Sequence, residues 1–235
     1  TERGATECFR ALRMAGEGGD GSGRAAGAGG CWRAVLAVLD TLHLRGTASA
    51  KAYVSAWNAL RGIFVGKHTF GSREEERRCP ELYSLTVRTF ERAASGAVLS
   101  AEEFAGRPEE GRNGDRLEEL TPHFFHVYLS TIATASGPSA AQHHLRMLEK
   151  RGFKKYLEPV SYRRIASEWL KEAETAQRRE REEARRGNYD VPVPPRHAVL
   201  ADVTALFRKT FRSNCADVSL LLSRLQQLRS SPSPP

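Results

Sequence analysis

Two pairs of histidines are the residues in this chain whose spacing comes nearest to a metal site. His123 and His126 lie one helical turn apart, and His143 and His144 are adjacent. A protein metal site needs further ligands at a matching spacing, and partners that orient each imidazole. No cysteine or carboxylate spacing of that kind accompanies either pair. The sequence therefore favours ordinary packing or surface histidines, and it predicts no metal and no other cofactor.

Other catalytic patterns are also missing. The glycine-rich residues 16–30 lack the preceding strand and the closing Lys-Ser/Thr of a phosphate-binding loop. The sequence contains neither a nucleophile elbow nor a paired-carboxylate site, so it predicts that the protein is not an enzyme. Its cysteines are too far apart for a zinc knuckle, which indicates buried free thiols in a reducing compartment. They are Cys8, Cys31, Cys79 and Cys215.

After these exclusions, the basic residues are the remaining candidates for a functional role. The chain has 36 Lys and Arg against 28 Asp and Glu, a net charge of +8, which suggests an acidic partner such as nucleic acid. The densest cluster lies in residues 146–164, where seven cations accompany only Glu149 and Glu158. The seven are Arg146, Lys150, Arg151, Lys154, Lys155, Arg163 and Arg164.

Cations gathered on one ridge bind phosphates, and the nearby Tyr156 and Tyr162 are candidates for stacking on bases. The alternative is a solvated loop whose cations favour a helix C-terminus. A second candidate patch consists of Arg208, Lys209 and Arg212. The run RREREEARR at 178–186 places opposite charges three and four residues apart, which is typical of a solvated helix.

Apolar residues at helical spacing run through most of the chain, and no period-2 strand is followed by a hairpin signal, so we expect an all-α fold. The division inside 160–186 stays open, because one long helix fits that stretch as well as two. We expect five helix pairs: about 5–15 with 31–45, 51–65 with 82–95, 122–136 with 138–151, 160–173 with 174–186, and 197–211 with 215–229.

Helix ends carry their usual signals. Thr121-Pro122 predicts an N-cap followed by proline in the first turn, and Gly137-Pro138 predicts a break between two helices. Gly152 and Gly187 fit the residue after a helix C-terminus. We expect connections at 16–30, 66–81 and 95–119, with a short helix beginning at a capping box near Ser100. Regular repeats should occupy 120–229, degenerate ones 1–119, and a disordered tail 230–235.

The spacing of these signals suggests a repeat. Gly152 and Gly187 are 35 residues apart, and Trp57 and Phe125 are 68 apart. A unit of 34 to 37 residues made of two helices predicts an α-solenoid of antiparallel helix pairs with loop insertions. Each pair stacks on the next because it cannot bury its apolar face alone.

The repeated unit resembles that of the pentatricopeptide repeat (PPR) family. The stretch Met147–Gly152, followed by Pro159 and Tyr162, matches the end of one unit and the aromatic start of the next, and Trp57-Asn58-Ala59-Leu60 is similar to the Tyr-Asn-x-Leu start of a first helix. The resemblance is good over about 120–173 and passable over 31–65. It implies single-stranded RNA binding inside mitochondria or plastids.

By motif position the resemblance makes Asn58, His126 and Arg163 the residues that read bases. His126 and Arg163 depart from the family's small polar residues, so a base-by-base code is not expected. Degenerate, insertion-rich units of this kind look like those of organellar ribosomes in certain protists.

Together these features lead us to expect an RNA-binding helical-repeat protein, an architectural subunit of a mitochondrial ribosome or of its assembly intermediate. Its partners would be ribosomal RNA and other proteins of a large ribonucleoprotein. No apolar run approaches the roughly 20 residues that span a membrane. The alternatives are a protein-binding helical scaffold and a free mitochondrial RNA processing or editing factor.

Overall fold

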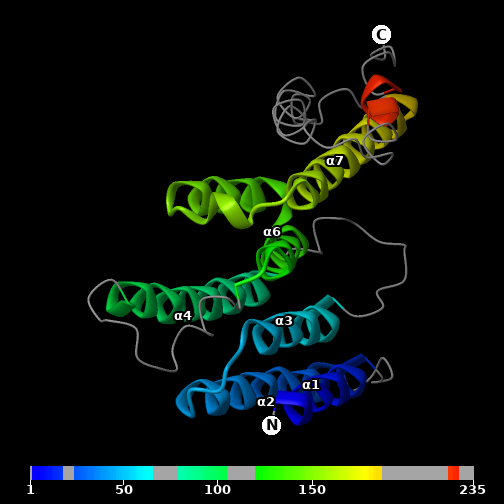
Figure 1. Cartoon of the computed structure of the whole chain (residues 1–235). Coiled ribbons are helices and arrows are strands. Elements are labelled where there is room, and N and C mark those ends of the chain that lie inside the picture. Colours follow the sequence, from blue (N-terminus) through cyan, green and yellow to red (C-terminus); the bar gives the residue numbers. More distant parts are fainter. Residues whose placement is uncertain (1, 18–23, 66–78, 105–119, 187–221, 228–235) are drawn as a thin grey trace. The chain divides into compact units, whose positions relative to one another are not determined.

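The computed structural model describes residues 2–17, 24–65, 79–104, 120–186 and 222–227 (Figure 1). Within those residues every regular element is helical, which confirms the predicted all-α fold. The elements are α1 (Glu2–Glu17), α2 (Arg24–Leu44), α3 (Ala50–Val65), α4 (Pro80–Phe104), α6 (Pro122–Lys150), the 3-10 helix η2 (Phe153–Tyr156) and α7 (Pro159–Arg185).

The chain divides into two compact units, Thr1–Gly137 and Pro138–Pro235. The boundary lies inside α6, at the non-helical Gly137, whose φ and ψ angles are 87° and 172°. The first part of α6 therefore belongs with the helices before it, and the second part belongs with α7. The predicted change from degenerate to regular repeats at residues 119–120 stays a prediction.

In the N-terminal unit, α1 packs against α2 and α3, and α3 packs against α4 (Figure 1). Aromatic side chains join α3 to the first part of α6: Trp57 lies 4.9 Å from Phe124 and 5.7 Å from Tyr128, measured between ring centroids. Tyr53, one turn earlier on α3, also contacts Phe124. Because residue numbers rise together in these contacts, the two helices run in the same direction.

Helix α4 runs the other way along α6. The Phe90 ring stacks on Tyr128 at 4.0 Å and lies 5.9 Å from Phe124. At the start of α4, the Cys79 backbone N–H donates to the Ala135 carbonyl over 2.8 Å. Low residue numbers on α4 thus meet high ones on α6. The aromatic rings named here are almost fully buried: Trp57, Phe90, Phe124 and Tyr128.

Helix α2 reverses into α3 through a short turn at Gly46, which adopts φ 64°. Polar contacts hold the helices beside the turn: His43 Nδ1 lies 3.0 Å from the Tyr53 hydroxyl, and Arg92 of α4 forms an ion pair with Asp40 of α2. Burial, and then the Arg92 charge, lower the pKa of His43. The imidazole therefore stays neutral at pH 7.

The C-terminal unit is built on the second part of α6 and on α7. The Tyr162 hydroxyl donates to Glu149 over 2.9 Å, and the Trp169 indole N–H donates to Gln142 over 2.7 Å. Moving seven residues along α7 moves the partner back by seven on α6, so the two segments run in opposite directions. Their buried apolar residues include Leu145, Leu148, Ile165, Ala166 and Leu170.

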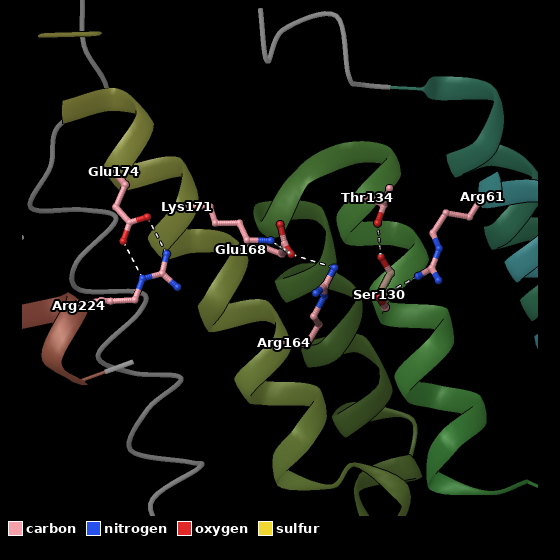
Figure 2. Close-up of polar contacts among 8 residues, drawn as sticks. All are labelled: Arg61, Ser130, Thr134, Arg164, Glu168, Lys171, Glu174 and Arg224. Atoms are coloured by element: carbon pink, nitrogen blue, oxygen red, sulfur yellow. Dashed lines mark hydrogen bonds and ion pairs between the residues drawn. The ribbon is translucent and has the colours of Figure 1, made fainter. Parts of the chain in front are cut away.

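A helical turn at 222–227 lies against α7 in this unit. Arg224 makes a two-pronged contact with Glu174, with Nε–Oε1 and Nη2–Oε2 distances of 2.8 and 2.6 Å (Figure 2). The Leu225 side chain beside it is buried. The rest of the predicted 197–211 and 215–229 helices lies outside the described residues.

The predicted helix ends are confirmed where the structure describes them. The Phe124 backbone N–H approaches the Thr121 hydroxyl at 3.4 Å, as expected of an N-cap. Gly137 breaks α6, and Gly152 follows its end with φ 86°. Both angles lie in the region that favours glycine, because a side chain would be strained there. Gly187 lies outside the described residues.

Two sequence predictions were wrong in part, and the structure settles the division that the sequence left open inside 160–186. Residues 24–30, expected in a loop, are helical, since alanines lie among the glycines and adding turns to an existing helix avoids the cost of nucleation. Residues 95–104 continue α4, so the capping box near Ser100 starts no new helix. Residues 160–185 form one helix, because neither glycine nor proline interrupts it and its charges pair along the axis.

Of the cysteines, Cys8, Cys31 and Cys79 are free thiols, as predicted, but they are half-buried rather than buried, and Cys215 lies outside the described residues. Burial raises the pKa of the Cys79 thiol, so that the thiol is protonated at neutral pH. This favours a structural residue over a reactive one.

Candidate nucleic-acid interface

The connection between α6 and α7 is held by apolar anchors at both ends. Helix α6 closes where the Arg151 backbone N–H donates to the Met147 carbonyl, and Gly152 then reverses the chain in the left-handed conformation. Phe153 and Leu157 are both buried, one at the start of η2 and one just after it. With these two side chains directed inward, Lys154 and Lys155 between them are exposed.

Five cations at the end of α6 and on the connection after it are exposed, and we call them the basic turn. Lys150 and Lys154 have no ion-pair or hydrogen-bond partner for their ammonium groups in the part of the chain that the structure describes. Lys155 Nζ lies 4.9 Å from the centre of the Tyr156 ring, a cation–π contact that leaves its charge at the surface. The members of the basic turn are Arg146, Lys150, Arg151, Lys154 and Lys155.

Of the two carboxylates in the basic stretch, only Glu158 is exposed. Glu149 is half-buried and accepts the hydrogen bond from Tyr162, so it contacts α7. Within residues 146–158 the five exposed cations outnumber the two carboxylates, so this stretch keeps a net positive charge. Exposed like charges lying within a few residues of one another repel, and an anion that binds them all relieves that repulsion.

The other two cations of the predicted cluster are not part of this surface. Arg163 and Arg164 are half-buried on the first turns of α7. Arg164 Nη2 lies 3.0 Å from Glu168 Oε1, and Lys171 contacts the same oxygen at 3.0 Å (Figure 2). The Arg164 charge thus supports the helix itself, so the structure separates the seven predicted cations into five exposed and two half-buried.

Tyr162 is not placed to stack on a base, contrary to the sequence expectation. Its ring is buried and its hydroxyl is bound to Glu149. Burial, followed by the hydrogen bond to that carboxylate, raises the pKa of Tyr162. The sequence signal was ambiguous because an aromatic residue early in a helix suits a core position as well as a surface one.

The three predicted base-reading residues belong to different parts of the molecule. Asn58 lies half-buried on α3, where its Oδ1 accepts a bond from Arg61 Nη2 at 3.1 Å, while Arg61 Nη1 donates to Ser130 Oγ at 3.3 Å (Figure 2). His126 is half-buried on α6 in the same N-terminal unit, and Arg163 belongs to the C-terminal unit. Their role in reading bases stays a prediction.

The remaining sequence candidates add little to this surface. Arg208, Lys209 and Arg212 lie outside the described residues. In the RREREEARR run, Arg178 and Glu182 are exposed, one turn apart, on α7. Among the described residues, no group of three or more His, Cys, Asp or Glu side chains is placed to hold a metal ion.

Sequence reasoning missed two kinds of residue at this site. Phe153 and Leu157, the anchors of the basic turn, had a signal, because two apolar residues flank the cationic pair at a spacing of four. Glu149 and Gln142 had none, since their partners on α7 are found only after the helices pack together.

No family model, curated protein or solved structure matches this chain in comparisons with known proteins. None of the helices in the described part of the chain is both long and apolar enough to cross a membrane.

Proposed function

We propose that the chain binds RNA through the basic turn, and that it is an architectural subunit of a mitochondrial ribosome or of its assembly intermediate. The observation that carries RNA binding is the set of five exposed cations at the end of α6 and on the anchored connection that follows it. The resemblance to PPR proteins supports the ribosomal and mitochondrial part of the proposal. Ribosomal RNA and neighbouring proteins of the particle are the proposed partners.

A fixed set of cations suits phosphate binding. Each phosphate that a Lys or Arg neutralises releases condensed counterions, and this release supplies most of the non-specific affinity for nucleic acid. Phe153 and Leu157 anchor the backbone of the basic turn. Little backbone entropy is therefore lost on binding, which leaves more of the electrostatic gain as affinity.

The proposed architecture is an α-solenoid of helix pairs. In support of it, α3 and the first part of α6 run in the same direction while α4 runs opposite to α6, the alternation expected when each two-helix unit stacks on the next. The turn after α2 and the one after α6 each pass through a left-handed glycine, Gly46 and Gly152. In such an array the connections of successive units lie at its edge, where RNA has access to them.

Removing three lysines tests RNA binding at the basic turn. The variant is Lys150→Gln, Lys154→Gln and Lys155→Gln, and the matched control is Arg3→Gln, Arg10→Gln and Lys51→Gln, three exposed cations of the N-terminal unit. Both variants change the net charge equally. If the three lysines each contact a phosphate, the slope of log affinity against log salt falls by about 2 to 3 in the first variant only. Equal slopes for both variants would remove the basic turn from the interface.

The ribosomal assignment is tested by crosslinking the tagged chain in purified mitochondria and sequencing the attached RNA. Ribosomal RNA at a few fixed sites supports the architectural role. Dispersed messenger RNA indicates a processing or editing factor. Recovery of proteins in a salt-tolerant complex without RNA indicates a protein-binding scaffold.

A further inference from the structure

We infer that the basic turn binds double-helical RNA along its phosphates, rather than single strands by stacking on their bases. This inference rests on the proposed function and names the form of RNA that the surface fits. It departs from the single-stranded partner that the PPR resemblance implies. Two sets of observations carry it: where the aromatic side chains around the turn lie, and how the cations are held.

The aromatic rings in and beside the basic turn are buried or half-buried, and each contacts another residue of the chain. Phe153 and Tyr162 are buried, at 9% and 6% exposure, and the Tyr162 hydroxyl is bound to Glu149. Trp169 is half-buried and donates its indole N–H to Gln142. Tyr156 is half-buried, with the Lys155 ammonium 4.9 Å from the centre of its ring.

Proteins that bind single strands combine a basic groove with exposed aromatic rings, and each stacked base adds between about 5-fold and more than 100-fold in affinity. Phe153 and Tyr162 are buried, Trp169 is hydrogen-bonded, and the Lys155 ammonium already lies over the half-buried Tyr156 ring. A single strand bound at the basic turn would therefore gain phosphate contacts alone. Its flexible backbone would also lose entropy on being ordered, which a stiff duplex has largely lost already.

The cations themselves suit a duplex. Arg146 and Lys150 lie one helical turn apart at the end of α6, about 6 Å along its axis, and the other three follow within five residues. Double-stranded DNA carries one charge per about 1.7 Å of axis, against about 3.4 Å for one strand, and the second strand of an RNA duplex doubles the charge in the same way. A compact, anchored group of cations therefore faces about twice the charge density on a duplex. Duplex RNA is recognised mainly through such backbone contacts and its shape.

The test compares two forms of one RNA with the full chain. Fluorescence anisotropy measures binding to a duplex of about 16 base pairs, the length that double-stranded RNA-binding domains span, and to each of its separated strands, chosen not to fold. The variants are the Lys150, Lys154 and Lys155 triple glutamine variant, its Arg3, Arg10 and Lys51 control, and Tyr156→Leu. Circular dichroism checks that each variant keeps its helices.

The inference expects the duplex to bind at least 10-fold tighter than either strand. It expects the triple variant to lose at least 10-fold in duplex affinity while the control stays within threefold. Tyr156→Leu, which removes a ring but keeps an apolar side chain, should change binding to either form less than twofold.

Two outcomes overturn the inference: the strands bind more tightly than the duplex, or Tyr156→Leu loses 5-fold or more in affinity. In either case the proposed function still stands, provided that the triple variant weakens binding. A third outcome overturns both. If neither form binds, or if the triple variant binds both as well as the unchanged chain does, the basic turn is not an RNA interface.

Discussion

At the residue scale, a buried hydrogen bond joins Trp57 of α3 to Thr89 of α4 within the N-terminal core. The Trp57 ring is fully buried, and its indole N–H donates to the Thr89 hydroxyl over 2.8 Å. The hydroxyl in turn donates to the carbonyl of Leu85. A buried N–H group left without a partner costs about 1–3 kcal/mol.

We therefore expect Thr89→Val to lower the free energy of unfolding by about 1–3 kcal/mol, because valine keeps the shape but leaves the indole N–H unsatisfied. Urea unfolding followed by helical circular dichroism measures the change. Thr86→Val is the matched control: Thr86 is equally buried, but its hydroxyl only donates to the Leu82 carbonyl within α4. A loss in Thr86→Val as large as in Thr89→Val would contradict the role given to the indole bond.

Tyr162 and Glu149 give a second residue-scale prediction, in the pH dependence of stability. Burial and the neighbouring carboxylate raise the pKa of Tyr162 in the folded state, while an unfolded tyrosine keeps a pKa of about 10. Below pH 10 Tyr162 is protonated in both the folded and the unfolded state, so the stabilisation from its hydrogen bond to Glu149 is fully present. Above pH 10 the unfolded state loses its proton first, so this stabilisation declines as the pH rises toward the folded pKa.

We expect Tyr162→Phe to lower the free energy of unfolding by about 1–2 kcal/mol at neutral pH, through loss of the bond to Glu149. The difference between the two proteins should stay constant up to about pH 9.5 and narrow above pH 10, because only the unchanged chain carries this titration. Urea unfolding at a series of pH values measures it. In a Glu149→Ala background the same substitution should cost less. If the difference in the free energy of unfolding between the two proteins widened above pH 10, folding would lower the pKa of Tyr162 rather than raise it.

At the scale of elements, we expect the replacement of glycine by alanine to have opposite effects on stability at two exposed positions. Gly152 ends α6 with φ 86°, and a Cβ added there would meet no atom within 4 Å. Gly30 lies inside α2, where an added Cβ would also meet no atom. An alanine side chain would therefore fit without a clash at either site, and the two sites differ in their backbone conformation.

We expect Gly152→Ala to destabilise the chain by about 1–2 kcal/mol, the cost of a side chain in the left-handed conformation. Gly30→Ala should instead stabilise it by about 0.5–1 kcal/mol, because alanine has the higher helix propensity and restricts the unfolded chain more. Thermal unfolding shows whether each variant is more or less stable than the unchanged chain. Destabilisation by Gly30→Ala would show that α2 does not extend to residue 30 in solution.

The same elements show what sequence could and could not predict. The breaks at Gly137 and Gly152 were predictable because one residue's backbone conformation decides each of them. The continuity of α7 was left open, since two helices of 160–173 and 174–186 leave the same charge and apolar pattern as one. The helical residues 24–30 were missed because glycine content indicates a loop, whereas this stretch extends an adjoining helix.

The candidate site, too, was predictable from the sequence only in part. The sequence alone located the basic stretch, because charge is a property of composition and position. It did not separate the exposed Lys154 from the half-buried, ion-paired Arg164, since that distinction depends on which face of α7 packs against α6. Nor did it predict that Tyr162 would be committed to Glu149, thirteen residues away.

At the scale of the whole molecule, each compact unit has its own buried apolar residues. In the N-terminal unit, Leu82 of α4 is fully buried, close in sequence to the Phe90 that packs on α6. In the C-terminal unit, Leu170 of α7 is fully buried. Both units use α6, which is interrupted at Gly137 by a residue outside the helical conformation. An interrupted helix transmits cooperativity less well than a continuous one, because the hydrogen-bond ladder stops there.

Two matched substitutions test whether the units open separately. Leu82→Ala and Leu170→Ala remove the same atoms from fully buried sites, and each should cost about 2–5 kcal/mol in its own unit. We expect Leu82→Ala to speed amide hydrogen exchange in α3, α4 and residues 122–136 while leaving 138–150 and the first half of α7 nearly unchanged, and Leu170→Ala to do the reverse. Exchange followed by mass spectrometry on the full chain resolves these segments. If either variant speeds exchange equally in both units, the chain unfolds as one cooperative body, and Gly137 is a bend within it rather than a boundary.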